Sequence, residues 1–143
     1  MGNNTNLILE NQLCFPIYAT SRLITKLYRP FLLEIGLTYP QYLVMLVLWE
    51  NDNQKVSNIG EKLLLNTNTI TPLLKTMVKK GLIEKIKAPY DERVILIKLS
   101  KRGSQLKVKA SEIPTKMADT SSIPINELEQ MKSSMWKMLK YLQ

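Results

Sequence analysis

Residues 56–81 constrain the fold most, because their pattern is that of two short helices joined by a tight polar turn. The second helix, over residues 66–81, has a start rich in capping residues, Pro72 in its expected first turn, and Gly81 at its end. A shorter helix precedes it and is expected to open at Ser57, whose hydroxyl can cap it. Two helices in this order predict a helix-turn-helix unit.

The segments before this unit predict two more helices. Apolar residues recur at three- and four-residue steps over residues 9–35, and the regular helix is expected to begin within residues 12–15. A second helix over residues 38–50 is expected to be capped by Thr38 and to carry a proline in its first turn. The polar residues 51–55 then predict a turn.

The segments after the unit predict a β-hairpin and a helical C-terminal region. Residues 82–87 and 93–99 are β-prone runs on either side of a charged tip. Residues from 101 to about 117 and residues 125–142 have helical periodicity, and the apolar stripe of the last helix needs either the core or another subunit as its partner. The 143 residues therefore predict one mainly α domain with a small β-hairpin wing.

The positive charge of the chain is concentrated in its middle. The whole chain has 20 Lys and Arg against 12 Asp and Glu, a formal net charge of +8. Residues 55–102 hold 11 of these basic residues and 4 of the acidic ones, a net charge of +7 against +1 for the rest. A basic surface on a helix-turn-helix unit favours double-stranded DNA as a partner over a merely solvated face.

The residue types that the chain lacks exclude several functional classes. It has no His and one Cys, Cys14, so neither a Ser-His or Cys-His nucleophile pair nor a His-based metal site can form. We therefore expect no enzymatic activity, no metal and no cofactor. One cysteine also excludes an internal disulfide, which favours a cytoplasmic location. Residues 1–6 show neither a secretory signal nor a myristoylation motif, and the apolar run 43–49 is too short to span a bilayer, so no membrane association is expected.

The N-terminal part of the helix over residues 66–81 carries the residues expected to read DNA bases. The second helix of such a unit enters the major groove with its N-terminal residues against the base edges, where Asn can bind adenine and a Thr methyl can contact the thymine methyl. The predicted DNA-binding residues of this helix are Thr67, Asn68, Thr69, Thr71, Pro72, Lys75 and Lys79. Helix capping is the competing explanation for at least one of Asn66 and Thr67.

The tip of the predicted hairpin places Arg93 just after Asp91 and Glu92. An arginine at a tip can enter the minor groove, where the negative potential attracts it, and Asp91 would orient it. The alternative is an ordinary surface ion pair of about 0 to 1 kcal/mol without functional weight.

Five segments follow the pattern of one known family, in order and at its spacing. They are Leu9–Phe15 (LENQLCF), Thr38–Leu43 (TYPQYL), Leu48–Glu50, Leu73–Lys75 and Asp91–Arg93. On these residues the chain resembles the MarR-type winged-helix regulators, and specifically their one-cysteine organic hydroperoxide resistance branch. The block around Cys14, together with Tyr28 and Tyr39, is the most specific part of the resemblance. Residues 66–69 depart from the family pattern, which puts the operator preference in doubt.

The resemblance implies an architecture and a partner. It implies a homodimer whose helical dimerisation region is formed by residues 9–35 and 101–142, with residues 38–100 forming a winged helix-turn-helix head in each subunit. Two such heads would bind an inverted-repeat operator and repress transcription.

The resemblance also implies a redox switch. Cys14 would be the sensing thiol, and Tyr28 and Tyr39 would hydrogen-bond it, Tyr39 from the partner subunit. An organic hydroperoxide would oxidise the Cys14 thiolate to a sulfenic acid, and without a second Cys a small cellular thiol would then form a mixed disulfide. The adduct would break the tyrosine network, shift the heads and release the operator.

Three other functions remain open on the sequence. A MarR-like repressor can respond to a small aromatic ligand, with Cys14 acting only as a small buried hydrophobic residue. A thiol peroxidase is disfavoured by the absence of a resolving Cys and of an Arg-Thr-Pro setting. The winged helix can also serve protein contacts alone, without DNA.

Overall fold

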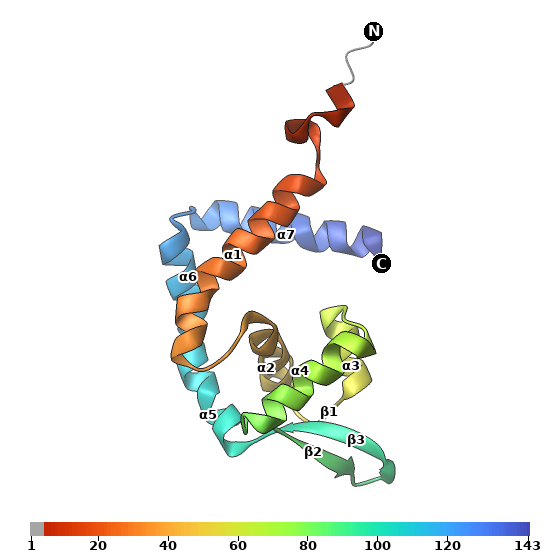
Figure 1. The fold of residues 1–143 in the computed structure, drawn as a ribbon. Helices are drawn as coiled ribbons and strands as arrows, with labels where there is room; N and C mark the ends of the chain where they lie inside the picture. Colours follow the sequence, from red (N-terminus) through yellow and green to blue (C-terminus); the bar gives the residue numbers. More distant parts are fainter. Residues whose placement is uncertain (1–4) are drawn as a thin grey trace.

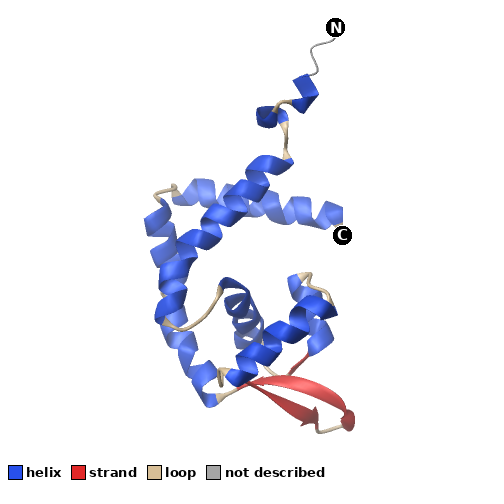
Figure 2. Ribbon diagram, in the orientation of Figure 1, coloured by secondary structure: helices blue, strands red, loops and turns tan. Residues whose placement is uncertain are grey.

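Seven α-helices and three short strands make up the computed structural model, which describes residues 5–143 (Figure 1, Figure 2). The helices are α1 (Cys14–Glu34), α2 (Tyr39–Glu50), α3 (Val56–Leu63), α4 (Thr67–Lys79), α5 (Lys101–Ala110), α6 (Ile113–Ser121) and α7 (Ile125–Leu142). The strands are β1 (Gln54–Lys55), β2 (Ile83–Ala88) and β3 (Asp91–Leu99), and two 3-10 turns, η1 (Thr5–Leu7) and η2 (Leu9–Asn11), precede α1. The expectation about an N-terminal signal falls mostly on residues 1–4, outside the described residues.

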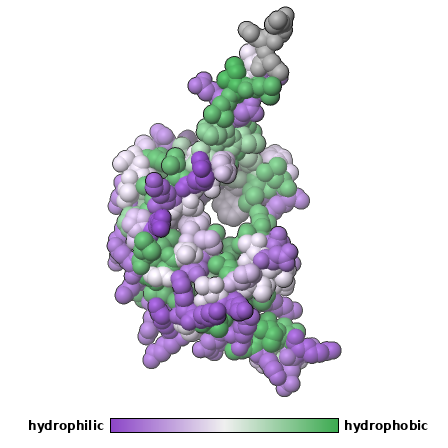
Figure 3. All heavy atoms as spheres, in the orientation of Figure 1, coloured by the Kyte–Doolittle hydropathy of each residue, from purple (hydrophilic) through white to green (hydrophobic). Residues whose placement is uncertain are grey.

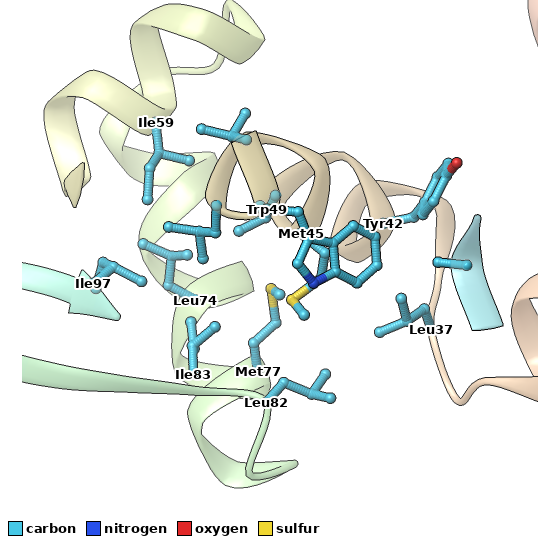
Figure 4. Packing of buried hydrophobic residues seen from close by; sticks show 14 of the residues in the cluster. Leu37, Tyr42, Met45, Trp49, Ile59, Leu74, Met77, Leu82, Ile83 and Ile97 are labelled. Atoms are coloured by element: carbon cyan, nitrogen blue, oxygen red, sulfur yellow. The ribbon is translucent and has the colours of Figure 1, made fainter. Parts of the chain in front are cut away.

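Helix α2 lies at the centre of the core. It begins as expected at Thr38, whose hydroxyl accepts a bond from the Gln41 amide while the Gln41 side chain accepts one from the Thr38 amide. Seven of its twelve residues are buried, so it is apolar nearly all round. Side chains from α3, α4, β2 and β3 close around it in Figure 4, among them Ile59, Leu74, Met77, Ile83 and Ile97.

Helices α3 and α4 confirm the helix-turn-helix prediction. Leu64, with a left-handed φ of 55°, ends α3, and the Asn66 side chain accepts a bond from the Thr69 amide at 3.0 Å to open α4. The prediction that Ser57 caps α3 is wrong, because α3 begins one residue earlier, at Val56, and has no side-chain cap. The chain passes directly from β1 into α3, which leaves no room for a capping turn.

The hairpin confirms the predicted wing and adds a strand that the sequence did not reveal. The sheet order is β1-β3-β2, antiparallel throughout, with Ile83 opposite Leu99. Residues 51–55, predicted to be only a turn, contain β1, which pairs Gln54 with Ile97. A two-residue strand has no periodicity of its own and exists only through this pairing.

The helix predicted from residue 101 to about 117 is interrupted, and that prediction is wrong. It is divided at residues 111–112 into α5 and α6, with Pro114 in the first turn of α6. Pro114 has no N–H to bond the Ala110 carbonyl four residues earlier, so a first-turn position suits it better than the interior of one long helix.

Helix α5 is packed into the winged head. The Trp49 indole N–H donates to the Gly103 carbonyl at 2.9 Å, and Lys107 Nζ donates to the Trp49 carbonyl at 2.9 Å. The core therefore continues across the boundary expected between residues 38–100 and 101–142.

No single described helix is long and apolar enough to cross a bilayer. Helices α1 and α2 reach the necessary length and composition only when taken together, across a bend of 72°. The apolar character of α2 is explained by its burial in the core.

Gly103→Ala tests the packing of α5. A Cβ at this position would lie 2.1 Å from the Leu82 carbonyl oxygen, a backbone atom that cannot move aside cheaply. We expect the free energy of unfolding to fall by about 3 kcal/mol, measured by urea denaturation at fixed protein concentration. Ser104→Ala, at an exposed position of the same helix, is the control and should change it by less than about 0.5 kcal/mol. Equal effects of the two substitutions would contradict this packing.

Candidate functional site

One face of α4 presents the residues predicted to read DNA. Ile70, Leu74 and Met77 are buried against the core. The predicted residues are all exposed, namely Thr67, Asn68, Thr69, Thr71, Pro72, Lys75 and Lys79. Because the apolar residues of α4 are buried in the core, its short polar side chains and lysines form an exposed stripe that can contact a ligand.

The cap of α4 limits which of these residues are free to bond a base. Asn66 Oδ1 accepts bonds from the Thr69 amide at 3.0 Å and from the Thr69 hydroxyl at 3.2 Å. The expectation that Asn66 or Thr67 serves as a cap is confirmed for Asn66. Thr69 is therefore engaged within the cap, whereas no described side chain bonds the Asn68 or Thr71 side chains.

Pro72 does not lie in the first turn of α4, and that prediction is wrong. The cap at Asn66 starts the helix at Thr67, so Pro72 falls inside it, in the second turn. A proline at this position cannot donate to the Asn68 carbonyl four residues earlier. That carbonyl therefore lacks the hydrogen bond that a residue with an N–H at position 72 would donate.

The charged tip predicted between the two strands is shorter in the structure, because Ala88 pairs with Asp91, and Asp91 and Glu92 belong to β3. Arg93 therefore lies in β3, just beyond the turn at residues 89–90, and is paired with Asp91. Its Nε and Nη2 donate to the two carboxylate oxygens of Asp91, each at 3.1 Å, and its backbone N–H donates to Asp91 Oδ1 at 3.0 Å. The Arg93 side chain is 90% exposed. These bonds, the side-chain ones first, lower the pKa of the Asp91 carboxyl. Arg93 and Asp91 are paired as expected, but an ordinary surface ion pair would look the same, so the entry of Arg93 into a minor groove stays a prediction.

Cys14 is the first residue of α1 and is exposed. The amide groups of a first helical turn have no intrahelical acceptor, and the helix dipole there favours an anion. The residues on either side of Cys14 in the sequence, Leu13 and Phe15, are apolar, and their side chains are 67% and 43% exposed. A thiol in this place is accessible to an apolar oxidant.

Three tyrosines pack together between α1 and α2. The Tyr28 and Tyr39 ring centroids are 5.2 Å apart, and Tyr42 lies 6.0 Å from Tyr28 and 6.3 Å from Tyr39. Burial raises the pKa of Tyr28 and of Tyr39, and it raises that of Tyr42 to about 12, with a smaller contribution from its two neighbours. All three phenols are therefore neutral hydrogen-bond donors at physiological pH. Tyr42 was not predicted, although its position three residues after Tyr39 puts both on one helix face.

The structure does not bring Cys14 and Tyr28 together within one chain. Both lie on α1, 14 residues apart, which corresponds to about 21 Å of helix. Tyr28 therefore does not bond Cys14 within its own chain, and a bond between the two in an assembly stays a prediction. Because Tyr39 packs against Tyr28, both tyrosines belong to one cluster that is remote from Cys14.

The arm η1–η2, the first half of α1 and the helix α7 leave large apolar side chains exposed. None of the residues of α7, all of which are described, is buried, and Trp136 is 62% exposed. An apolar groove of about 330 Å³ lies between Ile17 of α1 and Met135, Trp136 and Leu139 of α7. In Figure 3 the projecting arm carries hydrophobic residues beside hydrophilic ones, and hydrophilic residues lie at the lower end of the molecule.

Two other hollows flank the end of α1. One of about 280 Å³ is lined by Glu34, Lys109, Glu112 and Lys116 together with apolar residues. The other, of about 520 Å³, is also partly polar. Within residues 5–143 no group of three or more His, Cys, Asp or Glu residues is placed to hold a metal ion.

Comparisons with known proteins agree with this arrangement. A family model described as transcriptional regulator SarA/Rot matches residues 26–110. The chain is 45% identical over 134 residues to the organic hydroperoxide resistance transcriptional regulator of Bacillus subtilis (strain 168), covering 94% of this chain and 91% of that one. It is 30% identical over 132 residues to the HTH-type transcriptional regulator MgrA of Staphylococcus aureus, covering 92% and 90%.

A solved structure of reduced AbfR bound to DNA is similar as well. It has a TM-score of 0.75 and 36% sequence identity to this chain, and the match covers 94% of both chains. At this identity the likeness extends beyond the fold to the sequence.

Tyr42→Phe tests the burial of the tyrosine cluster. The folded pKa of Tyr42 lies above the ordinary value of 10.0, so the fold favours the neutral phenol. Its contribution to stability is complete below pH 10 and is lost as the pH rises towards 12. We expect an absorbance titration at 295 nm to lose its transition near pH 12 in this variant, and the variant to lose less stability than the wild type between pH 9 and 11. Tyr90→Phe, at the exposed hairpin tip, should keep that transition, and a transition near pH 12 that survives Tyr42→Phe would contradict the assignment.

Proposed function

The chain belongs to the SarA/Rot family of MarR-type winged-helix transcriptional regulators, and from this premise we propose that it is a DNA-binding repressor that senses organic hydroperoxides through Cys14. Oxidation of Cys14 releases the operator. The observation that carries the proposal is the position of the one thiol. It is exposed at an apolar helix start, about 21 Å along α1 from Tyr28, against which Tyr39 of α2 packs.

The separation of Cys14 from Tyr28 and Tyr39 supports a site formed by two subunits. In a two-fold dimer every contact occurs twice: if one residue contacts a second residue of the partner, the partner's copy of the first contacts the second in return. If Cys14 of one subunit meets Tyr28 and Tyr39 of its partner, the symmetry generates a second identical site. The exposed apolar side chains of α1 and α7 supply the surface that such a dimer would bury.

Neutral phenols suit the chemistry that this site would perform. Only the thiolate attacks a peroxide well, and two phenol donors and the amides of a first helical turn would stabilise it. The Cys14 sulfur attacks the distal peroxide oxygen, the O–O bond breaks and an alcohol leaves, which yields a sulfenic acid. A small cellular thiol then attacks the sulfenic sulfur and releases water, forming a mixed disulfide.

A mixed disulfide at Cys14 would change the dimer seam. The adduct adds a bulky group where the phenols pack and removes the anion that they stabilise. Movement of the two winged heads would follow, so that their spacing no longer fits two half-sites of an inverted repeat.

The exposed face of α4 and the wing support DNA as the ligand. Thr67, Asn68 and Thr71 can meet base edges. Lys75 and Lys79 can meet phosphates, and Arg93 can enter the adjacent minor groove. Thr69 would contribute mainly through the cap, and Pro72 by its apolar ring. A repressor of this kind acts in the cytoplasm, and it needs no enzymatic turnover, metal or cofactor.

Cys14→Ser tests the thiol switch. We expect the wild-type protein, treated with cumene hydroperoxide and a small thiol, to lose at least about tenfold in affinity for an inverted-repeat duplex, whereas Cys14→Ser keeps its affinity. The measurements are fluorescence anisotropy for affinity and intact mass for the adduct.

Three outcomes would count against the proposal. Loss of DNA affinity by oxidised Cys14→Ser would place the switch elsewhere, and sustained turnover of peroxide with a thiol reductant would indicate a thiol peroxidase. Release of DNA by a small aromatic compound without oxidation would favour the ligand-responsive alternative.

Asn68→Ala and Lys75→Met test the division of labour on α4. Asn68→Ala should cost about 1–3 kcal/mol on the preferred duplex and relax selectivity at one base pair in each half-site. Lys75→Met should weaken binding to all sequences and reduce the dependence of log K on log salt concentration. Glu84→Gln, at an exposed position of the wing outside the proposed contacts, is the control. If the salt dependence of DNA affinity is the same in Lys75→Met as in the wild type, Lys75 makes no phosphate contact.

A further inference from the structure

Lys80 connects the recognition helix to the loop between α1 and α2. It follows α4 directly, and its Nζ donates to the Gly36 carbonyl at 3.1 Å and to Gln41 Oε1 at 2.9 Å. The two acceptors are 44 and 39 residues away in sequence. We call this set of contacts the Lys80 bridge.

The far end of the Lys80 bridge is part of the start of α2. Gln41 is only 3% exposed, and its Oε1 also accepts the Thr38 amide at 3.1 Å, as the return half of the capping box. Tyr39 lies between these two residues and contacts Tyr28 on α1. The Lys80 ammonium therefore bonds the same short segment that places a tyrosine of the cluster.

The near end of the Lys80 bridge is fixed at the C-terminus of α4. Arg102 Nη1 donates to the Lys80 carbonyl at 2.9 Å, and the Ser100 hydroxyl donates to the Gly81 carbonyl at 2.7 Å. Gly81 itself has a φ of 69°, which a residue with a Cβ adopts at a cost. A shift of the α1–α2 loop thus acts on a well-anchored point of α4, at the opposite end from the residues that meet the bases.

We propose that the Lys80 bridge couples the tyrosine cluster to the orientation of α4, with Lys80 and Gln41 as positioning residues of the switch. Displacement of Tyr39 moves the segment from Gly36 to Gln41, and Lys80 transmits this movement to the recognition helix. The inference rests on the proposed function, since it concerns the response to oxidation of Cys14.

The competing role for Lys80 is an ordinary phosphate contact. Two of its three donor positions are taken by protein acceptors, which is the opposite of a lysine held free for DNA. Lys79 is the natural comparison, because it is adjacent, has the same charge, and has no hydrogen-bond or ion-pair partner among residues 5–143.

The experiment measures a ratio, the dissociation constant of the Cys14 adduct divided by that of the reduced protein for the same inverted-repeat duplex. For Lys80→Met we expect this ratio to fall at least about tenfold below the wild-type value, the scale of a typical coupling between two sites. Lys80→Arg, which keeps a charged donor, should restore most of the ratio. Lys79→Met should weaken both states equally, leaving the ratio unchanged and lowering the salt dependence.

Gln41→Met provides a second test that leaves the charge of α4 unchanged. It removes the buried acceptor at similar volume, so it should lower the ratio as Lys80→Met does. Thr38→Val is its matched control, because it removes the cap of α2 but leaves the bond between Lys80 and Gln41, and it should leave the ratio unchanged. Circular dichroism and the thermal midpoint establish that each variant is folded. If Lys80→Met does not fold, the ratio measured for Gln41→Met decides whether the Lys80 bridge carries the coupling.

The possible outcomes distinguish a failure of the Lys80 coupling from a failure of the proposed redox switch. A wild-type ratio near one would reject the redox switch itself. A large wild-type ratio that both Lys80→Met and Gln41→Met preserve would reject only the coupling. A salt dependence lowered by Lys80→Met at an unchanged ratio would make Lys80 a phosphate contact, and a ratio lowered by Thr38→Val would assign the effect to the cap.

Discussion

The burial of α2 is the constraint on which the rest of the structure depends. Its side chains Val44, Met45 and Leu48 are almost fully removed from water, each contributing about 1.5–3 kcal/mol relative to exposure. The helix-turn-helix unit, the sheet and α5 all pack around this one element. At its start it carries Tyr39 and the capping box, and at its end Trp49 holds α5 by a hydrogen bond to a backbone carbonyl. One buried helix thus links the tyrosine cluster, the DNA-reading unit and the C-terminal helices.

A single chain leaves much apolar surface uncovered on α1 and α7, away from the core around α2. Helices α1 and α7 bury very little, and their apolar side chains have the character of a core that lacks its second half. The same incompleteness holds for the chemistry, since the thiol and the phenols that would stabilise its anion lie at distant points of one helix and its neighbour. Dimerisation would complete both at once, which makes the proposed sensor a property of the assembly.

Local chemistry explains why much of the fold could be predicted from the sequence. Thr38 and Asn66 are caps whose side chains satisfy backbone amides within three residues, so their effect is local and visible in the sequence. The hairpin and the long first helix likewise follow from short-range patterns. β1 could not be predicted because it forms only by pairing with β3, more than 40 residues along the chain. The error about Pro72 has a local cause, since the Asn66 cap starts α4 at Thr67 and leaves Pro72 in the second turn.

The sequence by itself determined the class of the fold, the basic helix-turn-helix unit, the single thiol and the resemblance to peroxide-sensing regulators, because each of these depends on residue type and spacing over at most a few turns. Only the tertiary structure decided that Tyr42 completes the tyrosine cluster and that Lys80 bonds the start of α2. Such contacts join segments up to 44 residues apart. Their partners are set by how the elements pack, which no local pattern records.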